Sequence, residues 1–191
     1  MGSKTELTSY HKPCYTGRDI SRWVVSFNER FCYFNRKVKR GGCWDESMHF
    51  AKNKLLLRQV GHYPEAAIDT KGYAVLNTAF MVVPKAKDIQ PKYLLAVLNS
   101  PVVRCFWTNK FKDDRETFPK IKGEYLKKIP IPKASNDRQT EIGDLVNYVL
   151  AAKNSDPEMD TVEWEQKINQ LVYELYGLTE EEIAIMEDKS I

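Results

Sequence analysis

The spacing of apolar residues changes near residue 132, and this change divides the chain into two parts. Between residues 13 and 85 the apolar runs are short, contain many β-branched and aromatic residues, and are separated by Gly, Asn and Pro. Such runs predict several β-strands joined by turns. The expected strands lie within residues 23–25, 31–34, 54–60, 72–76 and 79–83.

Short helices are expected between and after these strands. Asp45 is suited to cap a first helix, and Pro91 is suited to open a second. The predicted helical segments are residues 45–52, 92–98 and 102–108. Residues 109–123 lack periodicity and are predicted to form a long exposed loop. Residues 125–132 are apolar and interrupted by Pro, which suits an edge strand or the exit from the domain.

From residue 134 the apolar positions recur with the period of an amphipathic helix. The two apolar stripes are Ile142, Leu145, Val146, Val149 and Leu150, followed by Trp164, Ile168, Leu171, Val172 and Leu175. Gly177 is expected to end the second helix, and Thr179 with Glu182 forms a capping box for a third. We therefore divide the chain into a body, residues 1–133, and a helical hairpin or spacer, residues 134–191. The stripes can pack on each other, on the body or on a partner.

The charge is divided in the same way as the pattern. Residues 1–133 contain 25 Lys and Arg against 12 Asp and Glu, a net charge of +13, whereas residues 134–191 contain 4 against 14, a net charge of −10. The overall charge of +3 hides both values. A strongly basic body indicates a polyanionic partner. The acidic segment would repel the same phosphates, so it must lie away from that contact.

Composition excludes several classes of protein. With 42% hydrophobic residues the chain is not a disordered one, and no apolar stretch approaches the roughly 18–20 residues of a membrane helix. The N-terminus lacks the apolar segment of a signal peptide. The four cysteines, Cys14, Cys32, Cys43 and Cys105, form no CxxC pair, and the histidines are not clustered near them. Reduced thiols in a cytoplasmic protein are therefore expected rather than a zinc site.

Six segments, in order, resemble the TaqI-like C-terminal specificity domain. They are KPCYTGRDI (12–20), KLLLRQVG (54–61), residues 67–73, YLLAVLNS (93–100), FPKI (118–121) and LKKIPIP (126–132). This family supplies the target recognition domains of restriction-modification enzymes and adenine methyltransferases. The resemblance implies an α+β fold, in which a mixed, twisted β-sheet domain with short helices is followed by a helical segment. It also implies sequence-specific binding of double-stranded DNA.

Candidate DNA contacts follow from the chemistry of the side chains. Lys and Arg bind phosphates without sequence information, whereas Arg suits guanine, and Asn and Gln suit adenine. The phosphate candidates are Arg36, Lys37, Lys39, Arg40, Lys120 and Lys122. The base-contact candidates are Arg58, Gln59, Asn77 and Thr78 near strand ends, and Asn109, Lys110, Lys112 and Arg115 in the predicted loop. Arg18 and Asp19 suit a structural ion pair or turn cap, and Trp23, Phe27, Phe31, Tyr33 and Phe34 suit core positions.

No catalytic residue is expected in this chain. Asn-Pro, which the related methyltransferases need, does not occur, and the Glu-x-Lys at Glu165–Lys167 lies in the acidic helical segment. The resemblance places catalysis in a separate methyltransferase or endonuclease module, in cis or in trans. S-adenosylmethionine and Mg²⁺ would be used there, so no cofactor is expected in this domain. The C-terminal helices would position that module or support a homodimer.

Two other classes of function remain open from the residues alone. The basic body could dock an acidic protein, which would make the chain an interaction adaptor. Alternatively, Asp113, Asp114 and Glu116 could hold a metal ion in a small nuclease. Charge also does not distinguish RNA from DNA.

Overall fold

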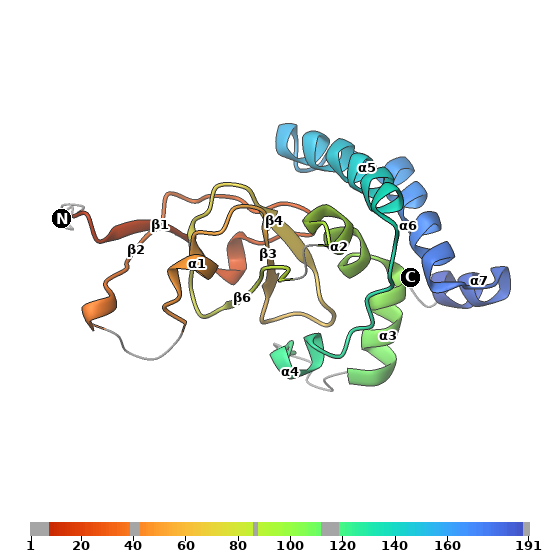
Figure 1. The fold of residues 1–191 in the computed structure, drawn as a ribbon, viewed down its shortest axis with the longest axis horizontal. Helices are drawn as coiled ribbons and strands as arrows, with labels where there is room; N and C mark the ends of the chain where they lie inside the picture. The colour runs from red at the N-terminus through yellow and green to blue at the C-terminus, as the bar shows by residue number, and fades with distance from the viewer. Residues whose placement is uncertain (1–7, 39–42, 86–87, 112–118, 189–191) are drawn as a thin grey trace.

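A computed structural model describes residues 8–38, 43–85, 88–111 and 119–188. The α+β class is confirmed, with the β-structure divided into two three-stranded sheets (Figure 1). The strands are β1 (His11–Tyr15), β2 (Phe31–Tyr33), β3 (Lys54–Arg58), β4 (Ala66–Asp69), β5 (Ala74–Val75) and β6 (Ala79–Val82). The α-helices are α1 (Glu46–His49), α2 (Pro91–Leu98), α3 (Pro101–Phe111), α4 (Gly123–Leu126), α5 (Asn136–Ser155), α6 (Val162–Tyr176) and α7 (Glu180–Asp188). Two short 3₁₀ helices are η1 (Gly17–Asp19) and η2 (Arg36–Val38).

The central sheet has the order β4-β3-β6, and both pairings are antiparallel. Leu56 of β3 pairs with Ala67 of β4 and with Met81 of β6. The side chains from Lys54 to Leu57 are buried on both faces of this strand, which explains why β3 has a continuous apolar run instead of an alternating pattern. The second sheet has the order β2-β1-β5, with β1 and β5 parallel.

One core joins the central sheet to the helices. Every residue of α2 from Tyr93 to Leu98 is buried, because this helix lies between the sheet and helix α5. Leu55 and Leu57 of β3 share an apolar cluster with Ile142 of α5 and Ile168 of α6. The apolar stripes of α5 and α6 both face this common core. The division of the chain at residue 133 stays a prediction.

Hydrogen bonds fasten the segment before α5 to the helices on either side. The Tyr93 hydroxyl donates to the Pro132 carbonyl at 2.6 Å, and the Tyr176 hydroxyl donates to the Pro130 carbonyl at 2.6 Å. Arg22 adds an ion pair to Glu165 of α6 and a hydrogen bond to the Asn99 carbonyl. The α5–α6 pair is therefore held to the body by polar contacts as well as by its apolar face.

The predicted helix boundaries are largely confirmed. The Asp45 carboxylate accepts from the Ser47 N–H at 2.9 Å and caps α1. Gly177 ends α6 in the left-handed conformation, with φ of 67°, and Thr179 and Glu182 form the expected capping box.

The structure corrects three expectations. Of the two alternatives for residues 125–132, the edge strand is wrong, because Tyr125 and Leu126 lie in helix α4 and no strand follows them before residue 132. The exit from the domain stays a prediction. The loop expected from Asn109 begins later, because α3 continues to Phe111. Phe27, Phe31 and Tyr33 are not core residues: they are 36%, 42% and 51% exposed. Phe31 and Tyr33 lie on one face of the short strand β2, where Phe31 contacts the Phe27 ring and Tyr33 contacts the Tyr10 and His11 rings.

Two acidic side chains, Asp69 and Asp19, are buried and form ion pairs. Lys54 and Asp69 form an ion pair with both side chains fully buried. Asp19 accepts from the Thr16 and Asn28 side chains and pairs with Arg30 at 2.7 Å, so it is structural as expected, although Arg30 replaces Arg18 as its partner. Burial alone would raise the pKa of Asp19, but these hydrogen bonds and the Arg30 charge together hold it below its usual value.

Helices α5 and α6 lie apart from η2 and α4, whereas the acidic helix α7 packs on α3. In Figure 1, α5 and α6 lie at the upper right, whereas η2 and α4 lie along the lower edge. Among the described residues, no helix is both long enough and apolar enough to cross a membrane.

Candidate nucleic-acid interface

Three segments that are far apart in sequence meet at one end of the central sheet. The Gln59 N–H donates to the Thr78 carbonyl at 3.0 Å, and the Gln59 carbonyl accepts from the Ile121 N–H at 2.9 Å. The Gly61 N–H also donates to the Pro119 carbonyl at 2.9 Å. We call this the sheet-end surface, and it comprises Arg58, Gln59, Asn77, Thr78, Lys120 and Lys122.

Backbone packing fixes this surface. Gly17 approaches Thr78 so closely that a Cβ atom at position 17 would lie 2.6 Å from the Thr78 carbonyl oxygen. The Gly17 N–H donates to the Thr78 hydroxyl at 2.8 Å. A Cβ atom at Gly123 would lie 3.2 Å from the Phe80 ring. The turn before β6 and the start of α4 are therefore both packed against the sheet, which gives the polar side chains a rigid support.

The four predicted base-contact side chains at this surface are not equivalent. The Arg58 guanidinium is paired with Glu65, and the Thr78 hydroxyl is used by Gly17. The amides of Gln59 and Asn77 have no side-chain hydrogen-bond partner among the described residues. Gln59 and Asn77 can therefore offer a donor and an acceptor to a ligand without breaking an existing bond.

Lysines surround an aromatic cluster beside this surface. Lys120 and Lys122 are exposed on either side of the buried Ile121. The Lys122 ammonium lies 5.1 Å from the centre of the Tyr125 ring, and Tyr125 stacks on Phe111 with ring centres 4.5 Å apart. This contact connects the last turn of α3 to α4 and keeps Lys122 in a defined position.

The other predicted contacts are distributed around this region. Asn109 and Lys110 are exposed in the last turn of α3, where the Asn109 amide donates to the Cys105 carbonyl at 2.8 Å. Arg36 and Lys37 are exposed in η2, and together with Lys12 they line a separate hollow of about 500 Å³. Lys39, Arg40, Lys112 and Arg115, and the alternative metal ligands Asp113, Asp114 and Glu116, lie outside the described residues.

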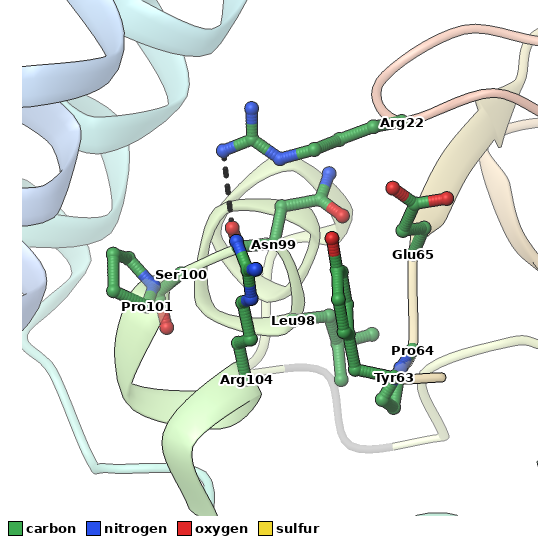
Figure 2. Close-up of a pocket in the computed structure, with 9 residues that line it drawn as sticks. All are labelled: Arg22, Tyr63, Pro64, Glu65, Leu98, Asn99, Ser100, Pro101 and Arg104. Carbon is green, nitrogen blue, oxygen red and sulfur yellow. Dashed lines mark hydrogen bonds between the residues drawn. The ribbon is translucent and has the colours of Figure 1, made fainter. Parts of the chain in front are cut away.

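An arginine-lined pocket that the sequence analysis missed lies behind the Val60–Glu65 loop. Figure 2 shows Arg22, Arg104, Tyr63 and Glu65 among the residues that line this pocket of about 220 Å³. The Arg104 guanidinium lies 4.3 Å from the centre of the Tyr63 ring. It has no ion pair among the described residues, so Arg104 is a further candidate for a phosphate contact. An isolated Arg in an apolar helix gave no signal in the sequence.

The Cys14 and Cys32 thiols lie on the paired strands β1 and β2. The hydrogen bond from Cys14 lowers the pKa of Cys32 to about 7. The same hydrogen bond and burial raise the pKa of Cys14. Within the described parts of the chain, no group of three His, Cys, Asp or Glu side chains is placed to hold a metal ion.

Comparison with known proteins gives a family match over most of the chain. A family model described as the TaqI-like C-terminal specificity domain matches residues 12–131. The matched region contains most of both sheets and extends through α2, α3 and α4, so it includes the whole sheet-end surface. No curated protein matches the chain.

Proposed function

The chain belongs to the TaqI-like C-terminal specificity domain family, and from this premise we propose that it recognises a short sequence in double-stranded DNA for a restriction-modification enzyme. The family supplies the sequence-specificity domains of such enzymes. The enzyme that this chain serves would be a type II restriction endonuclease or an adenine methyltransferase. The chain itself would bind DNA and leave catalysis to the other module.

The observation that supports this function most directly is the convergence at the sheet-end surface. Gln59, Asn77 and the segment carrying Lys120 and Lys122 come from three separate stretches of sequence, and backbone hydrogen bonds hold the first and third of them to each other. Side chains that contact base edges need a rigid support, and phosphate contacts nearby set their orientation. The sheet-end surface supplies both kinds of side chain on one support.

Binding would proceed through two kinds of contact. Lys120, Lys122 and the η2 residues Arg36 and Lys37 would neutralise phosphates and release counterions. Neutralising about six to eight phosphates would make log affinity fall against log salt with a slope of about −5 to −7. The Gln59 and Asn77 amides would then discriminate among bases through their paired donor and acceptor groups.

Catalysis would be performed by a methyltransferase or endonuclease module, in cis or in trans. S-adenosylmethionine for methyl transfer and Mg²⁺ for cleavage would belong to that module. The acidic helices α5, α6 and α7 would face away from the DNA, where they could position the module or join two copies of the chain.

The direct test is selection of the full chain against a randomised duplex pool at low salt, with sequencing of the bound fraction. Enrichment of one short motif is the expected result. Gln59→Ala should relax the preference at one position of the motif, whereas Asn147→Ala, an amide change on an exposed face of α5, should not. Retention without enrichment would leave only a non-specific phosphate binder, and no retention would favour a protein partner for the basic body.

A further inference from the structure

The arginine-lined pocket behind the Val60–Glu65 loop has a wall that hydrogen bonds hold in place. The Asn99 amide donates to the Ala66 carbonyl at 2.9 Å and accepts from the Ala66 N–H at 2.8 Å. The Arg22 guanidinium donates to the Asn99 carbonyl at 3.1 Å. A ligand would therefore meet groups that are already ordered, which lowers the entropy lost on binding. The polar side chains that carry the argument are Arg22, Tyr63, Glu65, Asn99 and Arg104.

The charges at this pocket do not balance. Glu65 pairs with Arg58, and Glu165 pairs with Arg22. Arg104, which also lines the pocket, forms no ion pair within the described ranges of the chain. Its positive charge is therefore left without a carboxylate partner, although Glu65 lies in the same lining. An anion suits this pocket better than a cation does.

Hydrogen-bond donors are also left over at the pocket. Figure 2 shows the Arg104 side chain alongside Tyr63, and the guanidinium carbon lies 4.3 Å from the centre of the ring. Stacking of this kind orients a guanidinium and leaves its N–H groups able to donate. The Tyr63 hydroxyl has no hydrogen-bond partner among the described residues. Arg22 has further donors as well, because its guanidinium carries five N–H groups and its bonds to Glu165 and Asn99 leave others over.

The size of the pocket limits the ligand to a small group. Its volume of about 220 Å³ is below the range of about 300–1,000 Å³ for pockets that hold drug-sized molecules. A phosphate group is compact and accepts several hydrogen bonds at once, and the planar fork of an arginine matches its oxygens in pairs. Charge, donors and volume therefore indicate the same class of ligand, an oxyanion of the phosphate type.

We propose that the arginine-lined pocket binds one phosphate group, held by Arg104 and Arg22 with the Tyr63 hydroxyl as a further donor. The group can belong to a small phosphate-bearing molecule or to the backbone of bound DNA. The pocket adjoins the sheet-end surface, because Val60, at the start of the bordering loop, pairs with Lys120. The pocket itself does not depend on the proposed function, whereas DNA as the source of the phosphate does.

The first arm of the test follows thermal unfolding of the full chain with increasing sodium phosphate, against sodium chloride at equal ionic strength. Phosphate should raise the unfolding midpoint of the wild type more than chloride does, because a ligand of the folded state stabilises it. Arg104→Gln removes the charge and the fork and should weaken the phosphate affinity about tenfold or more. Arg104→Lys keeps the charge without the fork and should retain part of the affinity. Arg138→Gln removes an arginine of α5 that does not line the pocket and should retain all of it. Each variant is compared with its own midpoint in chloride, which verifies that it is folded.

The second arm identifies the source of the phosphate by anisotropy titrations of a labelled duplex. If the DNA backbone supplies it, Arg104→Gln should weaken duplex binding and reduce the log affinity–log salt slope by about 0.9. If a small molecule supplies it, Arg104→Gln should leave duplex binding unchanged and lose the phosphate effect on unfolding. The inference is overturned if neither the phosphate effect nor duplex binding depends on Arg104. A chain that binds no duplex but shows an Arg104-dependent phosphate effect would refute the proposed function and support the pocket.

Discussion

The buried ion pair between Lys54 and Asp69 permits a quantitative prediction. Replacing Lys54 with Met keeps the volume and removes the ammonium group, which donates to Asp69 and to the carbonyls of Ala51 and Tyr73 at 3.2 and 3.0 Å. The Asp69 carboxylate would remain fully buried. Removing one partner of a buried pair costs about 3–5 kcal/mol, because the other charge is left uncompensated.

The surroundings of Asp69 place the expected loss near the lower end of that range. Its carboxylate also accepts from the backbone N–H groups of Lys71, Gly72 and Tyr73, at 2.8, 3.0 and 3.0 Å. These three bonds would stay and keep part of the charge satisfied. We therefore expect Lys54→Met to lower the free energy of unfolding by about 3 kcal/mol, a large part of the roughly 5–15 kcal/mol that stabilises a domain.

Urea unfolding followed by tryptophan fluorescence would measure this loss. The matched control is Lys167→Met, which removes the same group from an exposed pair with Glu163 on α6. That pair is screened by water, so no resolvable change is expected. A loss below about 1 kcal/mol for Lys54→Met, or one no larger than that of the control, would refute the argument from burial.

Three further predictions concern charge and titration. Lys120→Gln with Lys122→Gln should weaken DNA binding uniformly across sequences and reduce the log affinity–log salt slope by about 1.8, measured by anisotropy titrations at several salt concentrations. Because the pKa of Asp19 is lowered in the folded state, its ionised carboxylate stabilises the fold at pH values above the usual pKa of 3.8. This stabilisation is lost as the pH falls through the lowered pKa. Urea unfolding between pH 6 and pH 3 should therefore show a weaker acid dependence for Asp19→Asn. The reaction of Cys32 with iodoacetamide, measured by mass spectrometry as a function of pH, should have a midpoint near pH 7. Cys14→Ala should move that midpoint toward pH 9.

Each of these has a contrary outcome. An unchanged salt slope in the double lysine variant would mean that these side chains contact no phosphate. Equal acid dependence in wild type and Asp19→Asn would mean that other carboxylates account for it. A Cys32 midpoint near 9 in the wild type would mean that the thiol pair does not share a hydrogen bond.

Local features of this fold were accessible from the sequence because their causes are local. Asp45, Gly177 and the Thr179–Glu182 box act within one turn of chain, and the structure confirms all three. The stripe beginning at Ile142 needed only a repeat of apolar positions. Helix α4 was not predicted, because Tyr125 is held by stacking on Phe111, a partner that the local sequence pattern does not reveal.

The candidate site was partly accessible for the same reason. Residue chemistry identified Gln59 and Asn77 as potential base contacts, but only the tertiary fold places Lys120 beside them. Chemistry alone also gave Arg58 the same rank as Gln59, although a carboxylate seven residues later, Glu65, occupies its guanidinium. The family resemblance indicated the type of function, and the convergence of the three segments indicated where on the fold the candidate site lies.

The tyrosine hydroxyls that hold Pro130 and Pro132 would limit how far a module docked on α5 can move relative to the sheet-end surface. A segment fastened at both ends cannot act as a flexible tether, so a module docked on α5 would sit at a fixed reach from the bound sequence. Helix α5 has 20 residues, a length of about 30 Å. The acidic helices would then set the distance between the recognised sequence and the module. Tyr176→Phe removes the hydrogen bond to Pro130 and would broaden the spacing between the recognised sequence and the modified base.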